Sequence, residues 1–332
     1  MKYLFVEMYI SNDSTRCDEF IVKLKTEQYD ACVFYAPTEW EYFFTNHDKK
    51  LWNTIVEIIS ERGKKLEVIT GAAKILYGEP KLDFVTVHSW DTYFITATYH
   101  WWKDNIRELK PYSYKYIYMN NNAHAWRCKL IDLVAKNNLI NCGAVSWNKL
   151  NNNYAWKYFE QKILTLSDSF QNSFDYYSLP KEYDNSFMQL VSESTINALF
   201  ITEKTAVPLL TKKPFLVASV LGYHAHLKKL GFELYDEIFD YSFDEEIDED
   251  IRYQRLLDNL IKISRYSNEQ LNSLYNQIEE KLTYNKNRAI EIATKNINKP
   301  DILKILPLNI WDFYDKIYNN YVFVNVYPEL NK

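Results

Sequence analysis

The chain has 332 residues, which is more than one hydrophobic core usually accommodates and enough for two domains. Its formal net charge of −5 argues against a protein that coats DNA through a broadly basic surface, because phosphate contacts need an excess of Lys and Arg. No apolar run has the length of a membrane span, and no segment has the pattern of a signal peptide, so we expect a cytoplasmic protein.

The N-terminal third alternates predicted strands and helices. Strands are expected at residues 2–9, 31–35, 66–69 and 84–88, and helices at residues 18–26 and 48–62. This alternation is typical of a parallel sheet covered by helices on both faces. A polar stretch before Pro111 predicts a domain boundary at residue 110.

The strand pattern restarts after this boundary. Strands are expected at residues 114–118, 187–191, 199–201, 215–217 and 232–235, and helices at 126–137, 156–166, 223–230, 251–264 and 268–295. The acidic run at residues 244–250 predicts a solvated loop. We therefore predict an α/β fold with two Rossmann-like, doubly wound domains, residues 1–110 and 111–300, and a C-terminal helical tail, residues 301–332, that packs back on the first domain.

Several common catalytic and binding motifs are absent. The chain has no GxGxxG, GxxxxGK[ST], GxSxG or HExxH pattern, which argues against dehydrogenases, P-loop ATPases, α/β-hydrolases and zincins. The four cysteines are scattered without a CxxC pair, so we predict reduced, buried thiols and no metal site: Cys17, Cys32, Cys128 and Cys142.

The most informative pattern lies at residues 192–205, where a short apolar strand ends in the polar cluster Thr202-Glu203-Lys204-Thr205. In an open α/β sheet, ligands bind at the carboxyl ends of strands and at the helix N-termini that follow them. A carboxylate beside an ammonium there can bind a ribose diol and a phosphate of one nucleotide. The alternative is a helix N-cap at Thr202 with a solvated ion pair behind it.

A second pattern follows the predicted strand at residues 114–118. An Asn-rich turn that begins at Asn120 leads into a helix with Arg127 in its first turn. A guanidinium beside free backbone N–H groups makes an anion site, and the alternative is a surface arginine. His124 in the same turn is a phosphate donor, an N-terminal cap or a turn residue.

These segments resemble a known family. Residues 116–127, the turn at 143–146 and the phrase at 200–205 that runs on to Lys213-Pro214-Phe215 resemble the donor-binding half of fucosyltransferase-like glycosyltransferases. They are more similar to phage-encoded glycosyltransferase-like proteins, together with the later phrases at 227–232 and 240–244. A composition rich in Asn, Ile, Lys and Tyr fits an AT-rich genome, such as that of a phage, a virus or a low-GC bacterium. The resemblance to phage-encoded proteins implies the cytoplasm of an infected bacterial cell as the location.

The resemblance implies a GT-B fold, in which two Rossmann-like domains face a cleft that holds a nucleotide-diphosphate sugar. Residues 1–110 would then form the acceptor side and residues 111–300 the donor side. Glu203 would accept hydrogen bonds from the donor ribose, while Lys204 and Arg127 would neutralise the departing diphosphate in place of a metal ion.

The same resemblance adds Asn120, Thr202 and Thr205 to the expected donor site. The chain has no DxD motif of the kind that metal-dependent sugar transferases use. Fucosyltransferases often place a glycine in the segment after the Glu-Lys phrase, and this chain has none at residues 211–215, which leaves the donor sugar open.

Glycosyl transfer also needs a base near the acceptor hydroxyl. The candidates at predicted strand ends in the N-terminal half are Glu7, Glu41, Asp48, His88 and Asp91. We favour Asp91, because it follows a strand and because the rings of Trp90 and Tyr93 beside it are able to stack on a sugar or a base.

The expected acceptor is a hydroxymethylated base in double-stranded phage DNA. Because the net charge is acidic, a glycan or lipopolysaccharide acceptor is the alternative within the enzyme class. An epimerase-like enzyme of two Rossmann halves would need a pair of carboxylates around the sugar, and the sequence gives no strong signal for one. A non-catalytic nucleotide-binding or virion-associated module is the alternative from another class.

The aromatic residues at 99–102, with Lys103 and Arg107 near them, would form either an acceptor wall or a core patch.

Overall fold

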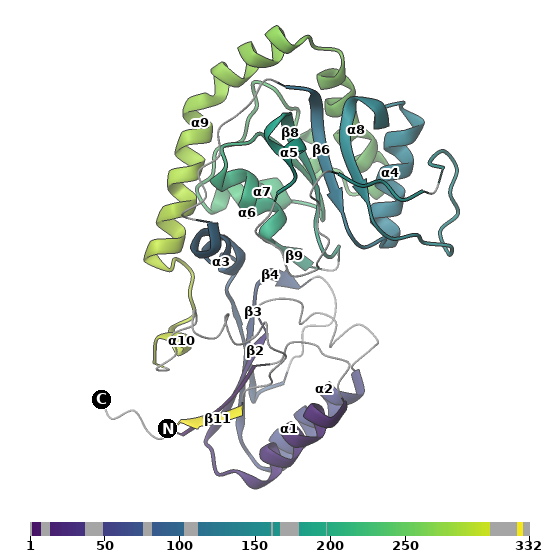
Figure 1. Cartoon of the computed structure of the whole chain (residues 1–332). Coiled ribbons are helices and arrows are strands. Elements are labelled where there is room, and N and C mark those ends of the chain that lie inside the picture. Colours follow the sequence, from purple (N-terminus) through teal and green to yellow (C-terminus); the bar gives the residue numbers. More distant parts are fainter. Residues whose placement is uncertain are drawn as a thin grey trace. The chain divides into compact units, whose positions relative to one another are not determined.

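The computed structural model describes residues 2–7, 14–36, 49–75, 82–102, 112–160, 162–166, 179–196, 198–305 and 324–327 (Figure 1). The chain separates into two compact units. The first comprises Met1–Tyr93, Asn197–Phe200 and Asn296–Lys332, and the second comprises Phe94–Ile196 and Ile201–Lys295. Each unit has its own parallel sheet with helices, so the predicted α/β class with two Rossmann-like domains is confirmed.

The first unit is built on a five-stranded sheet in the order β11-β1-β2-β3-β5. Its strands are β1 (Tyr3–Glu7), β2 (Ala31–Ala36), β3 (Lys65–Thr70), β5 (Val85–Ser89) and β11 (Val324–Tyr327), with α1 (Ser14–Thr26), α2 (Lys49–Glu61) and α10 (Asp301–Ile305) as helices. The strands are parallel except β11, which pairs antiparallel with β1. β4 (Ala72–Ile75) and β9 (Ala198–Phe200) form a separate antiparallel pair.

Strand alternation places the core of this unit. Leu4, Cys32 and Phe34 point to one face of the sheet, where they pack against Phe20 of α1 and Ile55 of α2. Both helices lie on this face, because each connects a strand to its parallel neighbour with the same crossover hand.

The opposite face of the same sheet is aromatic. Phe5 and Tyr35 have ring centroids 5.7 Å apart, and Tyr35 meets Tyr93 edge to face. Trp90 lies 5.2 Å from Tyr93, and both side chains are almost fully buried. The expectation that Trp90 and Tyr93 stack on a ligand is therefore wrong, because these rings already fill the core.

The second unit carries a four-stranded, all-parallel sheet in the order β10-β8-β6-β7. Its strands are β6 (Tyr114–Asn120), β7 (Gly143–Trp147), β8 (Ser186–Ser192) and β10 (Phe215–Ala218). Its helices are α4 (Ala125–Lys136), α5 (Lys181–Asp184), α6 (Glu203–Leu210), α7 (Tyr223–Lys229), α8 (Glu249–Ser264) and α9 (Asn268–Lys295), with the short 3₁₀ helices η2 (Ile140–Cys142) and η3 (Ser242–Glu245).

The strand order reverses direction in this sheet. From the central strand β6 the chain moves first to β7 on one side, and later to β8 and β10 on the other side. α4 packs with α8 on one face, and α6 packs with α9 on the other (Figure 1). The carboxyl ends of β6 and β8 therefore form the topological switch point at which open α/β sheets bind ligands.

The predicted helix at residues 156–166 is wrong for the part of it that the structure describes. The carboxylate of Asp132 accepts hydrogen bonds from the backbone N–H groups of Lys157, Tyr158 and Phe159, at 2.7–3.3 Å. These N–H groups are thus unavailable to helical carbonyl partners. The apolar pattern instead reflects a loop whose aromatic rings pack on Trp147.

Three further expectations for the second unit need correction. Residues 232–235 are not a strand, because the amide of Asn285 in α9 pairs with both the N–H and the carbonyl of Glu233. Residues 143–146 form strand β7 and not a turn. In the acidic run, Asp244 is buried against His224 and Asp248 caps α8, so this segment is only partly a solvated loop.

The sequence predicts neither the short helix α5 nor a helix at residues 93–102. α3 (Tyr93–Trp102) begins at the last residue of the first unit and contains the aromatic residues at 99–102. Among the described residues, no helix is both long and apolar enough to cross a membrane.

Candidate functional site

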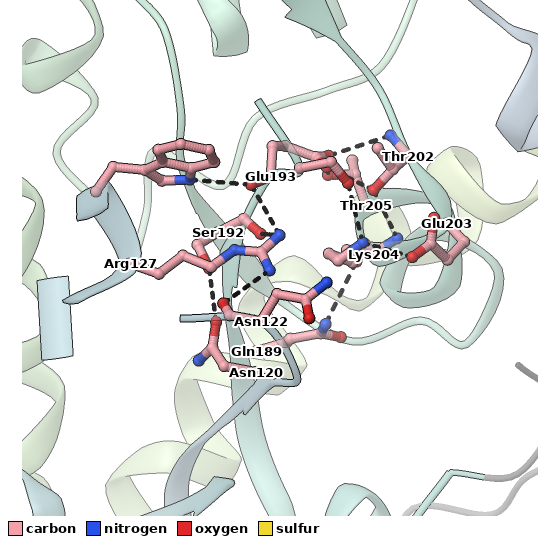
Figure 2. Close-up of polar contacts among 12 residues, drawn as sticks. Asn120, Asn122, Arg127, Gln189, Ser192, Glu193, Thr202, Glu203, Lys204 and Thr205 are labelled. Atoms are coloured by element: carbon pink, nitrogen blue, oxygen red, sulfur yellow. Dashed lines mark hydrogen bonds and ion pairs between the residues drawn. The ribbon is translucent and has the colours of Figure 1, made fainter. Parts of the chain in front are cut away.

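The candidate site lies at the switch point of the second sheet. Asn120 ends β6 and Ser192 ends β8, and the Ser192 hydroxyl donates to Asn120 Oδ1 at 2.9 Å (Figure 2). The Asn120 side chain is only 4% exposed, and its Nδ2 has no hydrogen-bond partner among the described residues. A buried amide N–H that lacks an acceptor points to a ligand that supplies one.

Arg127 reaches this edge of the sheet from the first turn of α4. Its Nη1 donates to the carbonyl oxygen of Asn122 at 3.3 Å, and its Nη2 donates to the carbonyl oxygens of Ser192 and Glu193 at 3.4 and 3.0 Å (Figure 2). The side chain is 4% exposed, and Nε has no partner in the described part of the chain. All of these partners are neutral carbonyl groups, so this buried positive charge forms no ion pair with any described residue, which is costly unless an anion binds.

Glu193 links the two halves of the site, and sequence reasoning assigned it no role. Its side chain is fully buried. The carboxylate accepts hydrogen bonds from the backbone N–H and hydroxyl of Thr202, and from the hydroxyls of Thr205 and Tyr223, at 2.5–3.2 Å. Burial, and then the charge of Glu193, raise the pKa of Tyr223 well above its usual value, so this hydroxyl stays a donor.

The N-cap interpretation of Thr202 is confirmed. Its hydroxyl accepts a hydrogen bond from the backbone N–H of Lys204 at the start of α6. Thr202 and Thr205 are both buried, and their hydroxyls donate hydrogen bonds to the carboxylate of Glu193. The geometry of these two residues therefore suits positioning of the helix terminus better than direct contact with a ligand.

Glu203 and Lys204 form the partly exposed rim of the site. Lys204 Nζ lies 2.5 Å from Glu203 Oε1 and donates to the Ser194 hydroxyl at 3.3 Å (Figure 2). The side chain of Glu203 is 19% exposed and that of Lys204 is 27% exposed. The pair is therefore less solvated than the exposed ion pair that the sequence analysis gave as the alternative. A carboxylate and an ammonium are thus both accessible beside the carboxyl end of β8.

The ring of His124 lies within the influence of three positively charged side chains. Its ring stacks on Trp126, with centroids 4.6 Å apart and planes 4° from parallel. Burial lowers the pKa of His124, and the positive charges of Arg127, Lys204 and Lys149 lower it further, to about 4. Three cations therefore act on one imidazole, so the electrostatic potential at this edge of the sheet favours negative charge.

The remaining catalytic candidates belong to the first unit. Asp91 is 9% exposed in the turn between β5 and α3, and Asn298 Nδ2 donates to its Oδ1 at 3.0 Å. Its side chain therefore lies in the first unit, whereas Arg127 and Lys204 lie in the second. His88 pairs with Glu67 at 2.8 Å, which gives it a structural partner.

Several predicted positions lie outside what the structure describes. Glu41, Asp48, Lys103 and Arg107 fall in undescribed segments, and the side chains of Glu7, Trp101 and Trp102 are not described. Among the described residues, no group of three or more His, Cys, Asp or Glu side chains is placed to hold a metal ion.

Lys149 and Glu193 are the site residues that sequence reasoning missed. Glu193 stood inside the pattern at residues 192–205, and its position directly after a buried strand was the available signal. Lys149 follows β7 and carried no motif, so its place beside the Asn-rich turn depends on the parallel pairing of β6 with β7.

No protein-family model and no curated protein matches this chain. Among solved structures, the chain is similar to that of the DNA modifying enzyme beta-glucosyltransferase, studied in the presence and absence of its substrate uridine diphosphoglucose. That match has a TM-score of 0.39 and 11% sequence identity, and it covers 86% of this chain and 80% of the other. The resemblance to fucosyltransferase-type donor domains finds no support in these comparisons.

Proposed function

We propose that this chain is a GT-B-type glycosyltransferase that moves a sugar from a nucleotide-diphosphate sugar to an acceptor hydroxyl. The observation that carries the proposal is the buried guanidinium of Arg127, which has only carbonyl partners among the described residues and lies at the switch point of a parallel sheet. Lys204 is a second cation at the same edge of the sheet, and the charges of Arg127 and Lys204 both lower the pKa of His124. A diphosphate matches this charge and position.

The proposed chemistry uses these cations on the leaving group. The bond between the sugar C1 and the β-phosphate oxygen breaks, and its electron pair stays on that oxygen. The acceptor oxygen forms the new bond to C1 and loses its proton to a base. Arg127 and Lys204 stabilise the charge that develops on the diphosphate, which removes the need for a metal ion.

The other residues take supporting roles in this proposal. Glu203 accepts hydrogen bonds from the ribose hydroxyls, and Asn120 donates from its unpartnered Nδ2 to the ligand. Thr202 and Thr205 hold the N-terminus of α6 through Glu193. Asp91 of the first unit is our candidate for the base.

The acceptor class is also part of the proposal. A hydroxymethylated base in double-stranded DNA is the first acceptor to test, given the likeness of the sequence phrases to phage-encoded proteins. The net charge of −5 keeps a glycan or lipopolysaccharide as the second acceptor to test.

A thermal-shift screen tests the proposal. The purified chain is heated with UDP, GDP, CDP, ADP and their common sugar conjugates, because a ligand that binds only the native state raises the melting temperature. We expect a selective shift with one nucleoside diphosphate, followed by sugar transfer to hydroxymethylated DNA or to a glycan. No shift with any of them would favour a non-catalytic module.

A further inference from the structure

Lys149 lies beside Arg127 on a different segment of the chain. Its Nζ donates to Asn122 Oδ1 at 2.8 Å, and the backbone carbonyl of Asn122 accepts from Arg127 Nη1. The Lys149 side chain is exposed, and it forms no ion pair with a carboxylate in the described part of the chain. Asn122 therefore holds two cations, neither of which has an anionic partner there.

The loop that carries Lys149 is firmly anchored. Asp132 binds the backbone at residues 157–159 through its carboxylate, and Asn151 Nδ2 donates to the carbonyl oxygen of Ala123 at 2.7 Å. The indole of Trp156 donates to the carbonyl oxygen of Asn151 at 3.0 Å. Ordering this loop before a ligand arrives reduces the entropy lost on binding, so Lys149 is presented at a defined place.

Arg127 separates Lys149 from Lys204. One end of the guanidinium binds Asn122, which holds Lys149, and the other end binds the carbonyl of Glu193, whose neighbour Ser194 holds Lys204. Lys204 also lies next to Glu203, the proposed ribose ligand. The cation at the far end from the ribose is therefore Lys149, where the β-phosphate would lie.

Two buried polar atoms support a ligand at this position. Asn120 Nδ2 and Arg127 Nε have no partners among the described residues, and both side chains are 4% exposed. We propose that Lys149, carried by the loop at residues 148–160, is a third cationic ligand that binds the β-phosphate of the nucleoside diphosphate. This inference rests on the proposed function.

The charges explain the use of a third cation. The diphosphate of a nucleotide sugar carries two negative charges, and the leaving nucleoside diphosphate gains a third when the bond to C1 breaks. Arg127 and Lys204 act on the donor, but Lys204 also lies 2.5 Å from the Glu203 carboxylate. Lys149 supplies a further positive charge for the additional charge on the leaving group. An interaction that strengthens as this charge develops accelerates transfer more than it tightens donor binding.

Calorimetry with the full chain tests this assignment. The probes are UDP, GDP, CDP and ADP, each compared with the monophosphate of the same nucleoside. Lys149→Ala is expected to weaken binding of the preferred diphosphate about tenfold or more, as for the loss of a charge-assisted hydrogen bond. Binding of the monophosphate is expected to change less than about threefold, because its single phosphate lies at the Lys204 end.

Lys157→Ala is the matched control. It removes one exposed positive charge from the same loop, while Asp132 still binds the backbone N–H of residue 157. Lys149→Arg should retain most of the affinity. If Lys149→Ala leaves the diphosphate affinity unchanged, or if Lys157→Ala weakens it as much, Lys149 does not bind the β-phosphate. The proposed function would still stand in that case. Absence of binding by every diphosphate to the unaltered chain would overturn the proposed function as well.

Discussion

Arg127 donates from Nη2 to the backbone carbonyl oxygen of Glu193 over 3.0 Å. The carboxylate of this same glutamate binds the hydroxyls of Thr202 and Thr205 at the start of α6. One residue at the end of β8 thus holds the guanidinium from α4 and the helix that carries Lys204. Arg127 and Glu193 are 66 residues apart in sequence, and the two halves of the candidate site are coupled through their contact.

This coupling predicts a large effect of Glu193→Ala on stability. The substitution leaves four buried donors, from Thr202, Thr205 and Tyr223, without their acceptor. We expect the free energy of unfolding in urea to fall by about 2–5 kcal/mol. Glu280→Ala, at an exposed position of α9, is the control and should change it by less than about 0.5 kcal/mol. If both variants lose the same free energy of unfolding, Glu193 does not hold the two halves of the site together.

Lys204→Ala should reduce turnover more than it weakens acceptor binding, because the ammonium acts on the leaving diphosphate. We expect a loss of about 10²–10³ in kcat, the range found when one electrostatic stabiliser of a transition state is removed. Steady-state kinetics with the acceptor as the varied substrate measure both quantities. Lys228→Ala, at an exposed position of α7, is the control. Equal losses in kcat and in acceptor affinity would contradict the leaving-group role.

Glu203→Ala should mainly weaken donor binding, because the carboxylate is proposed to accept hydrogen bonds from the ribose. The loss expected for charge-assisted hydrogen bonds is about tenfold in Kd or more. Calorimetric titration with the nucleoside diphosphate measures it, and the deoxyribose analogue should show a smaller difference between variant and parent. Unchanged donor affinity would take Glu203 out of the ribose site.

His124 gives a prediction for pH dependence. Its pKa is about 4 in the folded chain, mainly because of burial and then because of Arg127, Lys204 and Lys149, and an unperturbed histidine titrates near 6.5. Between these two values the unfolded chain binds more protons, so this group stabilises the fold above about pH 6.5 and the contribution is lost as pH falls toward 4.

The test compares thermal unfolding from pH 7 to pH 4 in the parent chain and in His124→Gln. We expect a smaller decline of the melting temperature in the variant. Histidine NMR spectra should also show a midpoint near 4 that rises when a nucleoside diphosphate binds, because an anion offsets the neighbouring cations. A midpoint near 6.5 in the free protein would show that neither burial nor the three cations lower the pKa of His124.

Activity should survive EDTA. Arg127 and Lys204 are proposed to carry the counter-charge for the diphosphate that a divalent cation carries in metal-dependent transferases. The measurement is sugar transfer before and after chelation, with Mg²⁺ added back. A strict requirement for Mg²⁺ would count against this mechanism.

Much of the fold follows from local pattern. The helix at residues 268–295 is predicted to the residue, and the strand starting at residue 114 is predicted within two residues at its end. Apolar spacing reports such elements because each buries a repeated face. The same reasoning fails at residues 156–166, where a distant carboxylate, Asp132, binds the backbone and the aromatic spacing belongs to a loop.

Local sequence patterns predict the α/β class and point to Arg127 and Lys204, because strand and helix periods and strand-end polarity are properties of neighbouring residues. Which distant residues meet these two side chains depends on the tertiary structure. The reversal of strand order brings the ends of β6 and β8 together, and this places Glu193 beside Arg127. The pairing of β6 with β7 places Lys149 beside Asn122. Such contacts depend on which strands pair, and strand pairing is decided by packing across the whole unit and not by any local pattern.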